Sequence, residues 1–161
     1  MITTFTEFLR EKAAREAAEA ERHKGVVEEW QAAVERLFGR IREWLDRSDP
    51  DRIIQITQKQ HEVRENGLGR YHVPRIDLQA FGKWIGIIPK ARYTVAVAHP
   101  PQRSPERATG RVDITDEVRR YVLYRFPNEA GEDQWMIDDL RTEEKPLDQL
   151  SFESALKSYL R

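Results

Sequence analysis

The polar and apolar positions of the chain change their pattern near residue 26. From Glu7 to Lys24 almost every residue is Glu, Arg, Lys or Ala, which are strong helix formers, and no large apolar side chain lies between Leu9 and Val26. Thr4 and Glu7 have the spacing of a capping box, which predicts that a helix begins there. This first part of the helix can bury little more than alanine side chains, so it is either a solvated arm or one helix of a close-packed pair.

After residue 26 large apolar residues repeat at alternating spacings of three and four, the a/d spacing of a heptad. The stripe is widened by Phe38 and Leu45, and Ser48-Asp49-Pro50 predicts its end because proline cannot continue a helix. Either the stripe covers the sheet of its own domain, which we favour, or it forms a coiled-coil seam with another chain. Its main positions are Val27, Trp30, Val34, Leu37, Ile41 and Trp44.

The predicted helix is longer than a compact domain of this size is wide. An unbroken helix from Thr4 to Asp46 would be about 63 Å long, whereas a compact chain of this size is about 40 Å across. The helix therefore either bends near Gly25, where a glycine weakens it, or extends beyond the domain. We expect residues 1–161 to form a single domain, with residues 1–25 as a candidate projecting helical arm and residues 26–161 as a globular α+β body.

The rest of the chain alternates apolar and polar residues in the manner of strands. Asn66-Gly67 predicts a two-residue hairpin loop between strands at 53–64 and 68–78, and Pro74 predicts an edge or bulge in the second. Residues 84–88 and 93–97 are predicted to pair around a turn at Pro89-Lys90. Further strands are expected at 111–114, 118–126 and 134–140, and Ser151 is expected to cap a C-terminal helix. The predicted fold class is α+β, with a long N-terminal amphipathic helix, a meandering, mostly antiparallel sheet of five to seven strands and a short C-terminal helix.

Composition narrows the class of protein. The chain has 161 residues, of which 39% are apolar and 34% charged, so one globular domain is expected. No segment approaches the roughly 18 apolar residues of a membrane span, and the first residues lack the pattern of a secretory signal. The absence of cysteine excludes disulfides, thiolate metal sites and a cysteine nucleophile. We expect a cytoplasmic protein that does not contact a membrane.

Charge is divided along the sequence although the net charge is −1. Residues 70–111 contain eight basic and two acidic residues, whereas residues 127–149 contain eight acidic and two basic ones. Such asymmetry points to partners, although the two segments could also face each other within the fold.

No motif of a known catalytic site is present, so we expect no enzyme activity and no cofactor. In a two-residue hairpin His61 would lie opposite His72, but a third metal ligand is not evident and no metal site is predicted. Glu143-x-Lys145, which follows Asp133 and Asp138, resembles the acidic and E-x-K residues of restriction-type nucleases. However, Lys145 is followed by proline, and we interpret this segment as a solvated acidic turn.

Two modes of binding remain. The favoured hypothesis is a protein-interaction or self-association module, possible as a homo-oligomer, whose N-terminal helix contacts the partner through Phe5, Phe8, Leu9, Val27 and Trp30. The alternative is a nucleic-acid-binding accessory protein, because aromatic residues that can stack on bases alternate with cations in the strands of residues 70–111. Its contacts would be Arg70, Arg75, Lys83, Trp84, Lys90 and Arg92.

Overall fold

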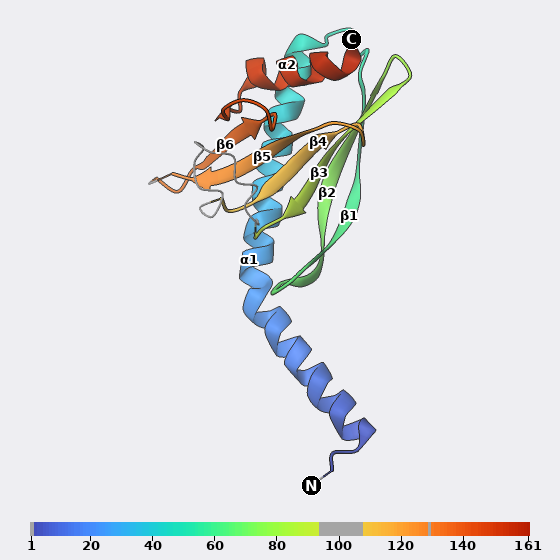
Figure 1. The fold of residues 1–161 in the computed structure, drawn as a ribbon, viewed down its shortest axis with the longest axis vertical. Helices are drawn as coiled ribbons and strands as arrows, with labels where there is room; N and C mark the ends of the chain where they lie inside the picture. The colour runs from blue at the N-terminus through green and yellow to red at the C-terminus, as the bar shows by residue number, and fades with distance from the viewer. Residues whose placement is uncertain (1, 94–107, 129) are drawn as a thin grey trace.

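A computed structural model of the protein describes residues 2–93, 108–128 and 130–161. Within these residues, seven strands form one antiparallel sheet in which the spatial order is the chain order. A long helix precedes the sheet and a short one follows it (Figure 1), so the predicted α+β fold is confirmed. The elements are α1 (Phe5–Ser48), β1 (Gln55–Glu65), β2 (Gly69–Ala80), β3 (Lys83–Ala91), β4 (Arg111–Thr115), β5 (Arg120–Pro127), β6 (Asp133–Asp138), β7 (Lys145–Pro146) and α2 (Gln149–Leu160).

Helix α1 is continuous over 44 residues. The predicted capping box is present: the Thr4 hydroxyl accepts a hydrogen bond from the Glu7 backbone N–H, and the Glu7 carboxylate accepts one from the Thr4 N–H, both at 3.1 Å. The helix passes through Gly25 without interruption, and Figure 1 shows that its axis changes direction where it leaves the sheet. It ends at Ser48, with Asp49 as the C-cap, as the Asp49-Pro50 sequence predicts.

The second half of α1 supplies the largest helical contribution to the core. Its heptad-spaced stripe packs on one face of the sheet, and α2 packs beside it, with the rings of Trp44 and Phe152 5.6 Å apart. The stripe therefore covers the protein's own sheet. Its fully or almost fully buried members are Trp30, Ala33, Val34, Leu37, Phe38, Ile41, Trp44 and Leu45.

The opposite face of the sheet carries a smaller apolar cluster. Because side chains alternate along a strand, Leu123 faces the helices while Val122 and Tyr124 point to the other side, where they pack with Phe126 and Met136. The sheet is thus apolar on both faces over β5 and β6, which explains why these strands contain nearly continuous apolar runs.

The β1–β2 hairpin differs from its prediction by one residue. Glu65 pairs with Gly69 and the loop has three residues, because Gly69 also adopts a positive φ of 75° and continues the turn. His61 consequently lies opposite Val73, and His72 lies opposite Glu62. A shift of one residue moves a side chain to the other face of a sheet, so the two histidines do not face each other.

Two further sequence predictions were wrong in detail. Strand β3 runs through Pro89 instead of turning there, and a change of register between Pro89 and Ala91 accommodates the proline opposite β4. The predicted strand at 93–97 lies outside the described residues except for Tyr93. Helix α2 is capped by Asp148, and Ser151 occupies the third helical position, where its hydroxyl accepts a hydrogen bond from the Asp148 N–H.

Candidate protein-interaction surface

The first half of α1 is a helix without neighbours among the described elements. Every residue from 5 to 22 is exposed, and Figure 1 shows this part of the helix extending beyond the sheet with no other element beside it. We call residues 5–24 the arm. A helix that makes no tertiary contact contributes nothing to the core, so its sequence is free to serve contacts with another molecule.

The tip of the arm exposes three large apolar side chains. Phe5 is 72% exposed, Phe8 45% and Leu9 48%. The two phenyl rings stack with their centroids 6.3 Å apart, and thus form a single small apolar surface. These are three of the residues predicted to contact a partner, and the structure leaves all three accessible.

The root of the arm, where α1 meets the body, is fixed by polar contacts. The Gln31 side-chain amide donates a hydrogen bond of 2.6 Å to the His72 carbonyl. Arg125 on β5 is buried and binds the carboxylates of Glu29 and Asp133, the latter at 2.7 Å. Arg36 also binds Asp133, at 2.8 Å, so helix and sheet are joined by a network of charged groups.

The network shifts the acidic groups toward their charged forms. Hydrogen bonds from Arg125 lower the pKa of Glu29. Burial raises the pKa of Asp133, but hydrogen bonds from Arg36 and Arg125 outweigh it, and the net pKa is lowered. Both carboxylates are therefore ionised at neutral pH, and the root of the arm is held by ion pairs.

Two predicted contact residues belong to the body. Trp30 is fully buried, with its ring 6.2 Å from that of Trp135 and its edge against Gly110, so it is a core residue and not a surface contact. Val27 is half-buried and packs beside the same core. The heptad spacing correctly predicted that Trp30 belongs to the apolar stripe. It did not predict that the sheet extends along α1 as far as Trp30.

Three of the predicted nucleic-acid contacts are engaged within the protein. Arg75 and Trp84 both donate hydrogen bonds to a buried carboxylate, that of Asp77, at 2.6 and 2.8 Å. The Lys83 ammonium binds the carbonyl oxygens of Tyr159 and Arg161 at the C-terminal end of α2, where a cation is favoured. These side chains therefore have structural partners.

The other three predicted contacts lie nearer to solvent. Lys90 is exposed, Arg70 is exposed and 3.8 Å from the Glu62 carboxylate, and Arg92 is half-buried over the Tyr93 ring. Sheet order separates these basic strands from the acidic β6–β7 segment by β4 and β5. The basic side chains available to a polyanion are thus fewer than the sequence indicates.

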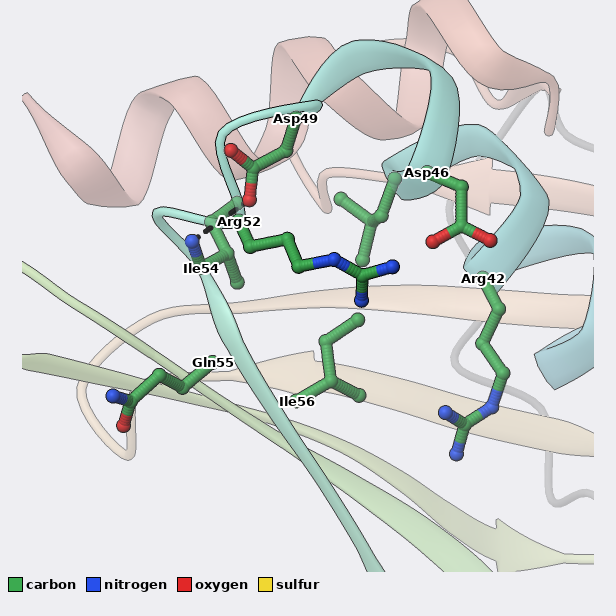
Figure 2. Close-up of a pocket in the computed structure, with 8 residues that line it drawn as sticks. Arg42, Asp46, Asp49, Arg52, Ile54, Gln55 and Ile56 are labelled. Atoms are coloured by element: carbon green, nitrogen blue, oxygen red, sulfur yellow. Dashed lines mark hydrogen bonds between the residues drawn. The ribbon is translucent and has the colours of Figure 1, made fainter.

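A cleft of about 410 Å³ lies between the end of α1 and the start of β1. Figure 2 shows the Arg52 side chain lying across it toward α1, from which Arg42 and Asp46 project. The Asp49 carboxylate already accepts hydrogen bonds from the backbone N–H groups of Ile53 and Ile54, at 2.9 and 2.8 Å. The charged side chains of the described lining are two arginines and two aspartates, and it contains no serine, cysteine, lysine or histidine.

Two buried carboxylates, those of Asp113 and Asp138, lie on the outer face of the sheet close to Tyr124, whose pKa is raised by burial and by both carboxylates. Asp113 is buried and binds the guanidinium of Arg111 through both oxygens, at 2.8 and 3.1 Å. Asp138 is buried at the end of β6, where one oxygen accepts the Leu140 N–H. Within the described parts of the chain, no three histidine, cysteine, aspartate or glutamate side chains are placed to hold a metal ion.

Comparison with known proteins gives no match: none of the protein-family models, characterised proteins or solved structures is similar to this chain. None of the helices in the described residues combines the length and apolar character needed to cross a membrane.

Proposed function

We propose that the protein is a non-enzymatic interaction module that binds a protein partner, or a second copy of itself, through the arm. The single observation that carries the proposal is an exposed helical segment of about five turns, whose tip presents Phe5, Phe8 and Leu9 to solvent. Surface apolar side chains grouped at the end of an otherwise polar helix are what an amphipathic helix offers to a binding partner.

The packed half of α1 makes such an arm feasible. A free helix of this length is only marginally stable in water because its first turn is costly to form. Here the buried half acts as the nucleus, and each added residue of the arm needs only propagation. The arm is therefore prepared for binding at a smaller ordering cost than a free peptide would have.

Deletion of residues 1–24 tests this proposal. The truncated chain, residues 25–161, should keep its melting temperature within a few degrees, because the deleted residues bury almost nothing, and should lose self-association or partner capture. Sedimentation velocity and thermal unfolding of both chains give the two readouts.

A matched control comes from the body. Val118 and Leu150 are 89% and 78% exposed, so Val118→Ala with Leu150→Ala removes exposed apolar surface away from the arm. This variant should associate as the wild type does. A truncated chain that fails to fold would instead make the arm part of the structural core and remove the reason for the proposal.

A further inference from the structure

The charges of residues 5–26 are inverted about the centre of this segment. In an antiparallel pair of identical helices centred between residues 15 and 16, two residues lie at the same level when their numbers sum to 31. In this arrangement no two like charges lie at the same level. Uncharged residues stand opposite the remaining charges, as Ala20 does opposite Glu11. Of the four oppositely charged pairs, Lys12 with Glu19 and Arg15 with Glu16 lie on the side of the helix that carries Phe5 and Phe8, whereas Glu7 with Lys24 and Arg10 with Glu21 point away from it.

Neighbouring arrangements lack this complementarity. A sum of 30 places Arg15 opposite its own copy and Glu11 opposite Glu19, and a sum of 32 places Glu16 opposite its own copy. A parallel pair in register brings every charge to the level of the same charge. Like charges at close approach disfavour a register, so the sequence selects one antiparallel arrangement against its neighbours.

The length of helix outside the core accommodates this arrangement. The helix begins at Phe5, and Val26 begins the half-buried pair of residues at which α1 joins the core. The midpoint between Phe5 and Val26 lies between Arg15 and Glu16, which is also the centre of the charge inversion. Two arms paired about this point overlap over about 32 Å and stop where each body begins.

This arrangement also provides a place for the apolar tip. At 100° per residue, Phe5, Phe8, Lys12, Glu19 and Val26 all lie within about 40° of the direction of Trp30, on one side of the helix. The tip residues of one copy then reach the root of the other, with Phe5 at the level of Val26 and Phe8 at that of His23. The half-buried side chains at the root thus gain an apolar cover.

We infer that the arm's partner is a second copy of this chain, bound antiparallel about a two-fold axis between Arg15 and Glu16. The inference rests on the proposed function of the arm and adds its partner, direction and register. Apolar contacts at both ends supply attraction, and the ion pairs of Lys12 with Glu19 and of Arg15 with Glu16 set the register. The intrahelical pairs Lys12–Glu16 and Glu19–Arg22, at 3.4 and 3.7 Å, are exposed and leave their charges accessible to a second helix.

Charge exchange tests the register. In a homodimer, Lys12→Glu sets two carboxylates against each other at both places where position 12 meets Glu19, and Glu19→Lys sets two ammonium groups against each other at the same places. Each variant alone should dissociate with a constant raised about tenfold or more, and the mixture should form a heterodimer because all its opposed charges attract. Sedimentation equilibrium of the full-length chains, separately and mixed, measures this.

Arg22→Glu is the matched control. It changes the charge by the same amount as Lys12→Glu and also breaks an intrahelical ion pair, but Arg22 lies opposite Leu9. Its dissociation constant should stay within about threefold of the wild type, and helicity by circular dichroism should be unchanged in all variants.

The outcomes separate the two proposals. A wild-type chain that remains monomeric at high concentration overturns the second-copy inference. The wild type can be dimeric and residues 25–161 monomeric while the mixture of Lys12→Glu and Glu19→Lys chains forms no heterodimer. In that case the arm binds in another arrangement, and only the register is wrong. If residues 25–161 dimerise as well as the full chain, the arm proposal fails too.

Discussion

The two halves of α1 have one backbone conformation and opposite surroundings. Residues 5–22 are exposed without exception, whereas the stripe from Trp30 to Leu45 contains eight buried side chains. Both halves are helical, and they differ in side-chain size: the arm carries alanines and charges where the packed half carries tryptophan, leucine and isoleucine. The same helix therefore forms along its whole length, although only its second half contributes to the core.

The largest expected contrast comes from the same substitution in each half. Leu37→Ala should lower the free energy of unfolding by about 2–5 kcal/mol because Leu37 is 1% exposed and its removal leaves a cavity. Leu9→Ala, at a half-exposed position of the arm, should change it by less than about 0.5 kcal/mol. Urea denaturation measures both. Equal costs would show that the arm is as much a part of the fold as the stripe.

Two separate glycine-to-alanine substitutions should change the stability of the protein in opposite directions. A Cβ at Gly110 would lie 2.1 Å from the Trp30 ring, so Gly110→Ala should destabilise the protein by about 1–3 kcal/mol. A Cβ at Gly25 meets nothing within 4 Å, and Gly25→Ala should stabilise α1 by up to about 1 kcal/mol. Thermal unfolding gives the sign. A stabilised Gly110→Ala would contradict the close packing of Trp30 against the loop before β4.

Acid should weaken the junction between the halves. The pKa of Glu29 and that of Asp133 are lowered in the folded protein, so each contributes stability above its unfolded pKa near 4, and this contribution is lost as the pH falls through the lowered folded value. Asp133→Asn should cost about 1 kcal/mol or more at pH 7, and the difference from the wild type should shrink below pH 4. A difference that is independent of pH would mean that the Arg125 network contributes no ionic stabilisation.

The nucleic-acid alternative predicts the smallest effect. If the exposed basic residues bind an oligonucleotide, Lys90→Ala with Arg92→Ala should weaken binding and reduce its salt dependence by roughly one unit of slope for each phosphate that is no longer bound. Lys83→Ala is the control, because Lys83 is bound to the end of α2. Fluorescence anisotropy at low salt measures the binding, and its absence for the wild type would discard this alternative.

Much of the fold was predictable because local signals agreed. The Thr4–Glu7 capping box, the heptad stripe and the Asp49-Pro50 stop together placed α1, and period-two alternation placed most strands. One error arose where two residues offered equivalent local choices. Asp148 and Ser151 can both cap a helix, and only the position of α2 on the core selects Asp148.

The candidate surface was predictable only in part. Small and charged residues indicated that the arm could bury little, and the structure leaves Phe5, Phe8 and Leu9 accessible; their contact with a partner stays a prediction. The burial of Trp30 could not be predicted, because it depends on where the sheet begins along the helix. Likewise, the Asp77 carboxylate that binds Arg75 and Trp84 is recognised only once the strand register is known.

Amide hydrogen exchange at several protein concentrations tests the central claim most directly. The amides of residues 8–24 should exchange far faster than those from Trp30 to Trp44 in dilute protein, and their protection should rise with concentration as the arms pair, while the packed half stays unchanged. Arm amides protected equally at every concentration would contradict the account, because the arm would then be stabilised within a single chain.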